Sequence, residues 1–146
     1  METITRIIHA LTQVHPLHPM LVHFPIALSG AGAFFILLAL LTRKKEFELI
    51  AFANISLAAV GTLAAGLTGM RDNFINYDGD APSASAKFVL AIILLVITTV
   101  TAVARWRNPN LFNQPKTKLI YITAYFVSFA IAIVLAFLGA VILYGM

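Results

Sequence analysis

The four histidines of this chain of 146 residues all lie between residues 9 and 23. Three of them, His15, His18 and His23, stand in the string HPLHPMLVHFP of residues 15–25. Imidazole is the side chain best suited to bind a metal or a haem iron, or to transfer protons, near neutral pH. The string runs directly into a long apolar stretch. We therefore expect any site of this protein to lie where its first apolar stretch begins.

The composition indicates an integral membrane protein. Apolar residues make up 60% of the chain and charged residues 11%, with a mean hydropathy of +0.92. Soluble domains are about half apolar and about one quarter charged. The absence of cysteine excludes disulfides, thiolate metal sites, iron–sulfur ligation and covalent c-type haem attachment. The net charge of +4 comes from Lys and Arg at the ends of apolar runs, so we exclude nucleic acid as a partner.

Four apolar runs are each long enough to cross a bilayer as a helix of about 20 residues. They cover residues 20–42, 47–70, 86–106 and 119–144. The runs are continuous rather than alternating, which predicts helices and not the strands of a barrel. Because the connections are short, we expect one all-α domain, an antiparallel up-down bundle of four transmembrane helices.

Residues 1–14 form a separate unit before the first run. The apolar residues with the spacing of one helical face are Ile4, Ile7, Ile8, Leu11 and Val14. We expect a short amphipathic helix that lies in the outer interface of the membrane. His9 falls on the opposite, polar face of this helix and is assigned to solvent rather than to the site.

Basic residues in the connections predict the orientation of the bundle. Those near the first and third connections are Arg43, Lys44, Lys45, Arg105, Arg107, Lys116 and Lys118. The opposite side holds only Arg6, Arg71 and Lys87. We therefore place the first and third connections in the cytoplasm of a bacterium with the protein in its inner membrane. Both termini and the histidine string then face the periplasm.

His23 is the histidine that falls within a predicted span. On a helix it stacks over Ala27, Gly30 and Phe34, a mostly small stripe that lets another helix or a flat cofactor come close. An ionisable side chain within a span usually faces the bundle interior. Pro25 should bend this helix because it lacks a backbone N–H. We expect His23 to hydrogen-bond a neighbouring helix, to ligate a cofactor or to transfer protons.

The topology brings candidate partners to the same outer side. Met70 ends the second run, and the imidazole of His23 together with the thioether of Met70, or with His18, would suit the iron of haem b or copper(I). His15 and His18 could form a more exposed divalent metal site with Asp72. Alternatively, Asp72 orients an imidazole or pairs with neighbouring cations, and Met70 only packs at a helix end.

The other polar residues of the runs indicate packing rather than chemistry. Asn54 stacks over Ala58, Gly61 and Ala65, which predicts a close-packed helix face with one interhelical hydrogen bond. Tyr121 is assigned to an aromatic belt at the interface. We expect no acidic residue of the kind that ion-coupled transporters carry within their spans. We also find no nucleophile–base pair or carboxylate dyad in the spans that would support a stand-alone enzyme.

The run LHPMLVHFPIAL of residues 17–28 resembles the signature of small bacterial membrane proteins in the domain of unknown function 2231 family. Gly69 and Asp72 also resemble that family's glycine and aspartate after the second helix, and the four-span plan extends the resemblance over most of the chain. Some members are joined to Rieske-type iron–sulfur domains, so the resemblance implies a role linked to haem b or to quinone. Many members carry a histidine where this chain has Lys87, which excludes a bis-histidine haem through that position.

We therefore predict a small membrane protein that is a subunit of a redox or energy-converting complex. It would hold haem b or copper at the outer end of its first helix and take part in electron transfer. Its partners would be the lipid bilayer and other membrane subunits or a second copy of the chain. The alternatives are an accessory subunit without a cofactor and a permease or channel component.

Overall fold

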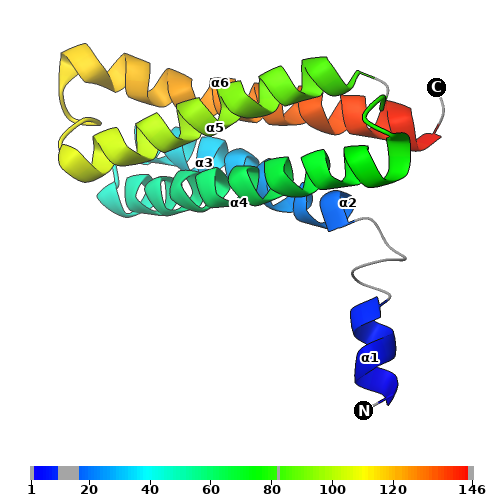
Figure 1. The fold of residues 1–146 in the computed structure, drawn as a ribbon. Helices are drawn as coiled ribbons and strands as arrows, with labels where there is room; N and C mark the ends of the chain where they lie inside the picture. Colours follow the sequence, from blue (N-terminus) through cyan, green and yellow to red (C-terminus); the bar gives the residue numbers. More distant parts are fainter. Residues whose placement is uncertain (1, 10–16, 82, 145–146) are drawn as a thin grey trace.

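The computed structural model describes residues 2–9, 17–81 and 83–144, and this part of the chain is helical without strands (Figure 1). The helices are α1 (Glu2–His9), α2 (Leu17–Leu21), α3 (His23–Thr42), α4 (Lys45–Tyr77), α5 (Ala84–Arg107) and α6 (Pro115–Tyr144). The predicted all-α class is confirmed. Helix α1 covers part of the predicted 1–14 segment, whose residues 10–14 lie outside the described residues.

Four segments of the described chain are long and apolar enough to cross a membrane. They are Leu17–Thr42, Lys45–Tyr77, Ala84–Arg107 and Pro115–Val141. Large apolar side chains such as Leu67, Val100 and Phe137 are exposed on the outside of these helices. Such a surface is unfavourable in water but suits the hydrocarbon core of a bilayer. The predicted four-span membrane bundle is confirmed.

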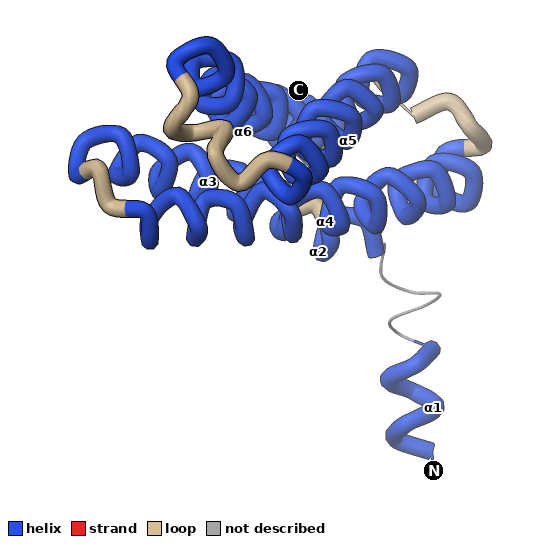
Figure 2. The backbone as a smooth tube through the Cα atoms, turned by 90° about the vertical axis from the view of Figure 1, so that its left-hand side faces the viewer, coloured by secondary structure: helices blue, strands red, loops and turns tan. Residues whose placement is uncertain are grey.

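The long helices form two layers, α3 with α4 and α5 with α6, and consecutive helices run antiparallel (Figures 1 and 2). Helix α3 packs against α4 and α6, and α5 packs against the same two helices. The α3–α4 and α5–α6 connections lie at one end of the bundle (Figure 1). Helix α2 and the α4–α5 connection lie at the other end. A site at one end of the bundle is therefore separated from a site at the other end by the length of a membrane span.

The helix that begins the bundle is interrupted where its prolines predict an interruption. The chain is helical from Leu17, turns at Val22 and resumes as α3. Pro25 cannot donate a hydrogen bond to the preceding turn. The next N–H, that of Ile26, reaches the carbonyl oxygen of Val22 only at 3.4 Å. The result is a turn at Val22 that divides the first span into the short helix α2 and the long helix α3.

Small residues on the inner faces allow α3 and α4 to pack closely. A Cβ atom on Gly61 would lie 3.2 Å from Cδ of Pro25, and Ala58 and Ala65 are buried on the same face. The packing face predicted for α4 is therefore present. The predicted interhelical hydrogen bond of Asn54 is wrong, because its amide donates to the carbonyl of Ile50 in its own helix at 2.9 Å.

Candidate functional site

His23 does not face the bundle interior. It is exposed at the start of α3, and its Nδ1 atom lies 2.6 Å from the carbonyl oxygen of Pro19. A carbonyl only accepts, so Nδ1 carries the hydrogen. Ala27 and Phe34 on the same stripe are also exposed, and Phe34 retains 56% of its accessible surface. The expectation that His23 faces the bundle interior is wrong. Gly30 of the same stripe does face a neighbouring helix, because an added Cβ atom there would lie 3.0 Å from the ring of Phe129 of α6.

Pro25 explains the outward position of His23. Pro25 is buried against Gly61 of α4. Successive residues of a helix are turned by about 100°, so positions two apart point in nearly opposite directions. The buried face of α3 continues from Pro25 through Ser29, Gly32, Ala33, Ile36 and Ala39. Small residues suit either face of a membrane helix, which is why the stripe itself could not decide between them.

Of the two histidines whose side chains the structure describes, His18 is the one that is built into the bundle. Its backbone N–H donates to Oδ2 of Asp72 at 3.0 Å. Its ring Nδ1–H donates to the carbonyl oxygen of Ala65 at 2.8 Å. The ring lies directly against Gly69, where an added Cβ atom would come within 2.9 Å of both Cε1 and Nδ1. We call this group of His18, Ala65, Gly69 and Asp72 the His18 latch, because it fastens α2 to α4.

The position of His18 in α2 explains why Asp72 binds there. His18 lies in the first turn of the helix, where backbone N–H groups have no partner within the helix. Asp72 supplies the missing acceptor from α4, and its second oxygen accepts from Arg71 at 3.2 Å. The carboxylate is buried, with 6% of the residue exposed, and both oxygens are engaged.

The latch brings together two of the five predicted ligands, His18 and Asp72. Within the described residues, no hydrogen bond joins His23 to the latch, and Met70 is 44% exposed. His15 lies outside the described residues. No group of three or more metal-binding side chains forms in the part of the chain that is described. The fold thus orients one imidazole beside one carboxylate.

A second polar cluster, which the sequence reading missed, lies buried at the opposite end of the bundle. Arg105 of α5 donates from Nε and Nη2 to the two carboxylate oxygens of Glu48 on α4, at 2.6 and 2.8 Å. The hydroxyl of Tyr121 donates to Oε1 of Glu48 at 2.9 Å and lies 2.8 Å from the hydroxyl of Tyr125. The guanidinium also stands 5.2 Å from the ring centroid of Phe52. We call Glu48, Arg105, Tyr121 and Tyr125 the Glu48 cluster.

The Glu48 cluster corrects three expectations. Glu48 lies within the predicted 47–70 run and is 2% exposed, so an acidic residue does stand inside a span. Tyr121 is buried rather than part of an interface belt. Arg105, counted among the connection residues, is 6% exposed and ion-paired. Without Arg105, six basic residues near the first and third connections stand against three on the opposite side. The predicted orientation is therefore unchanged and stays a prediction. The sequence did carry a signal for this cluster. Glu48 shares a helix face with Ala51, and a charged side chain on the inner face of a span requires a partner.

Two buried hydroxyls lie between the clusters. Ser29 of α3 and Ser128 of α6 are fully buried, and neither hydroxyl has a partner among the described residues. A Cβ atom on Gly32 would lie 3.3 Å from the ring of Tyr125. Both serines lie three residues from that contact on antiparallel helices, so they stand at a similar level. Thr98, by contrast, bonds to the carbonyl of Leu94 in its own helix, as buried hydroxyls usually do.

The spans and the latch together define a multi-pass α-helical membrane protein with its signature histidine fastened at one end. A family model described as "Predicted membrane protein (DUF2231)" matches residues 14–146. The chain belongs to this family, as the resemblance of its histidine string indicated. Comparison with curated proteins and with solved structures gives no match. His18, Gly69 and Asp72, which carried part of that resemblance from two separate regions of the sequence, meet in the latch.

Proposed function

We propose that the protein supplies His18 as one ligand of a haem iron or copper ion whose remaining ligands come from a partner membrane subunit. One observation carries this proposal. The Nδ1–H of His18 is fixed by the Ala65 carbonyl, which leaves Nε2 of the neutral ring as the acceptor. Metal-binding histidines usually donate their other ring N–H in this way, to a carbonyl or a carboxylate. Bound there, haem or copper would supply one-electron chemistry.

The incomplete ligand set is the reason for proposing a partner. Copper and haem sites use further nitrogen or sulfur ligands, and the described residues bring only Asp72 beside His18. Asp72 already holds the backbone of His18, so it acts as a positioning residue. A second ligand from another subunit, or from His15 of this chain, would complete the site. This supports a role as a subunit of a redox complex rather than as a stand-alone enzyme.

The side of the membrane is part of the same proposal. The latch lies at the end of the bundle that carries fewer basic residues, which by the distribution of Lys and Arg is the periplasmic side of a bacterial inner membrane. An electron-transfer site there would face periplasmic partners. Labelling of single cysteines introduced in the α4–α5 connection, with a reagent that does not cross the membrane, tests this orientation.

The test uses the protein purified from its own membrane in mild detergent with its partners attached. The absorption spectrum detects haem and elemental analysis detects copper. The variant His18→Asn places an amide nitrogen where Nδ1 stands, so it can still donate to the Ala65 carbonyl while it lacks Nε2. We expect a Soret band or stoichiometric copper in the wild type, and its loss in His18→Asn.

His23→Asn and Met70→Leu are the matched controls, because both side chains are exposed and neither belongs to the latch. Both variants should keep the cofactor. A wild-type complex with neither haem nor copper would overturn the proposal, as would a cofactor that survives His18→Asn.

A second candidate function is an accessory subunit that holds no cofactor. It is favoured by the completeness of the latch, in which the backbone N–H and ring Nδ1–H of His18 and both oxygens of Asp72 have partners within the chain. On this view the latch only shapes the end of the bundle that meets the partner. A colourless, metal-free complex that loses this subunit when Gly69 is changed to Ala, but retains it in His18→Asn, would support the accessory function.

A further inference from the structure

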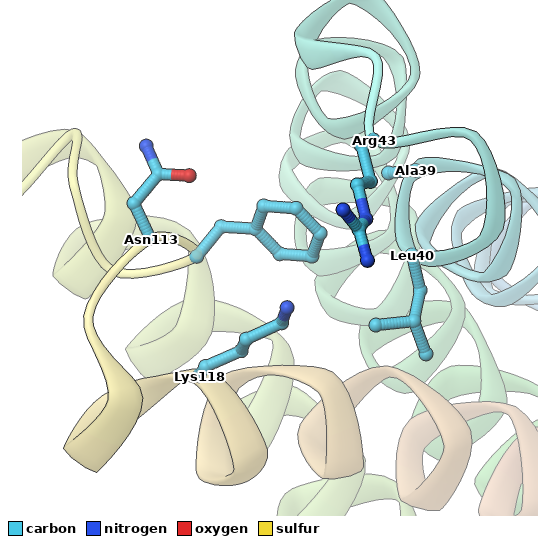
Figure 3. Close-up of a pocket in the computed structure, with 6 residues that line it drawn as sticks. Ala39, Leu40, Arg43, Asn113 and Lys118 are labelled. Carbon is cyan, nitrogen blue, oxygen red and sulfur yellow. The ribbon is translucent and has the colours of Figure 1, made fainter.

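A hollow opens at the end of the bundle opposite the His18 latch. It lies between the end of α3, the α5–α6 connection and the first turn of α6. Its lining residues are Ala39, Leu40, Arg43, Phe112, Asn113 and Lys118. Its volume of ≈ 390 Å³ falls within the range of about 300–1,000 Å³ that is usual for small-molecule sites. The charged ends of Arg43 and Lys118 point into it from two sides (Figure 3).

Local structure places the backbone of Arg43 and the ammonium of Lys118 at the hollow. Arg43 ends α3 in the left-handed conformation, at φ 58°, and its N–H closes the helix on the carbonyl of Ala39 at 2.9 Å. The ammonium of Lys118 stands 5.0 Å from the ring centroid of Phe112. The two side chains therefore reach the hollow from different helices. The site is shaped by the meeting of α3 and α6.

No ion pair among the described residues compensates the charge of the hollow. Among the described residues, the ion pairs of the bundle join Arg105 to Glu48 and Arg71 to Asp72. No described carboxylate forms an ion pair with Arg43 or Lys118. Glu48, the buried acid at this end of the bundle, is already bound on both oxygens by Arg105. Two converging cations in a concave site attract an anion.

We propose that this hollow binds the phosphate of an anionic phospholipid. The span Leu17–Thr42 ends immediately before Arg43, which puts the guanidinium at the level of the lipid headgroups. Arginine offers a planar fork of donors that suits phosphate oxygens, and Lys118 adds a second positive charge. Leu40 is exposed beside the cations and gives an acyl chain an apolar path along the bundle. Basic pockets between membrane helices are suited to such headgroups.

The test is a titration of the full chain in detergent with phosphatidylglycerol or phosphatidylcholine, followed by native mass spectrometry. We expect one phosphatidylglycerol to bind in preference to phosphatidylcholine. The variant Arg43→Gln with Lys118→Gln removes both cations of the hollow. At about fivefold for each cation near the membrane surface, its affinity for phosphatidylglycerol should fall about 25-fold.

Lys44→Gln with Lys116→Gln is the matched control, because it removes the same charge from the same end of the bundle without touching the lining of the hollow. Its affinity should change by less than about threefold, as expected of screened surface charges. Equal losses in the two double variants would overturn the proposal, as would equal binding of the two lipids. Displacement of the lipid by millimolar inorganic phosphate would show a free-anion site instead. The outcome is independent of His18, which lies at the other end.

Discussion

The two ends of α4 each carry a buried carboxylate, and the two carboxylates are held in different ways. Glu48 receives two N–H groups from the guanidinium of Arg105 on α5 and a hydroxyl from Tyr121 on α6, so side chains of two other helices close around it. Asp72 receives one backbone N–H from His18 and one contact from the adjacent Arg71. The Glu48 end is a closed ion pair, whereas at the Asp72 end no hydrogen bond among the described residues engages Nε2 of His18.

This difference separates a structural cluster from a candidate site. A buried ion pair whose oxygens are all bound offers nothing to a ligand, but it fixes which helices meet and at which level. A half-buried imidazole oriented by one nitrogen has the other nitrogen available for chemistry. The comparison therefore supports a role of the Glu48 cluster in assembly of the bundle, and it is the reason why we propose the His18 latch as the site.

The largest effect should come from the Glu48 cluster. Glu48→Gln leaves the buried guanidinium of Arg105 without a counter-charge, and the free energy of unfolding should fall by about 3–5 kcal/mol. Unfolding in mixed micelles with increasing dodecyl sulfate measures it. The double variant Glu48→Met with Arg105→Met removes both charges and should recover most of the lost free energy of unfolding. If the double variant is as unstable as the single one, the pair does not act as a closed unit.

A smaller effect is expected at the latch. Gly69→Ala adds a Cβ atom 2.9 Å from the imidazole of His18, so the ring must move, at a cost of about 1–3 kcal/mol. The same substitution at Gly66, where nothing lies within 4 Å, should be neutral or stabilise the helix by up to about 1 kcal/mol. The same unfolding assay compares them, and hydrogen exchange in α2 shows where the loss acts. Equal free energies of unfolding for Gly69→Ala and Gly66→Ala would mean that the imidazole of His18 does not pack against α4.

The smallest effect on the free energy of unfolding is predicted for Ser29 and Ser128, which lie between the two ends of the bundle. Ser29→Ala and Ser128→Ala each remove a buried hydroxyl without a partner among the described residues, so each variant should be neutral or more stable by about 1 kcal/mol. Thr98→Val, which removes a hydroxyl that is hydrogen-bonded, should instead lose about 1 kcal/mol. Destabilisation by either serine variant would reveal a partner for these hydroxyls, such as an internal water. The interior between the two ends would then be polar, and the two ends would not be separate.

The sequence by itself determined the class of protein and the number and order of its spans. A membrane helix is recognised from about 20 consecutive apolar residues. Because these residues are contiguous in the sequence, the span can be predicted without knowing how the helices pack. Pro25 likewise predicted a bend in the first helix, and the structure has a turn at Val22, between α2 and α3. The histidine string was sufficient to indicate the family that the match over residues 14–146 shows.

Only the tertiary structure decided which histidine belongs to the bundle. His18 and Asp72 are 54 residues apart in sequence, and Glu48 and Arg105 are 57 apart. The choice between His18 and His23 depends on the face of α3 that packs, and the contact of Pro25 with Gly61 sets that face. In lipid the hydrophobic effect does not distinguish the inner from the outer face of an apolar helix. Close packing and polar pairing between helices make that distinction, and both require the neighbouring helix to be in place.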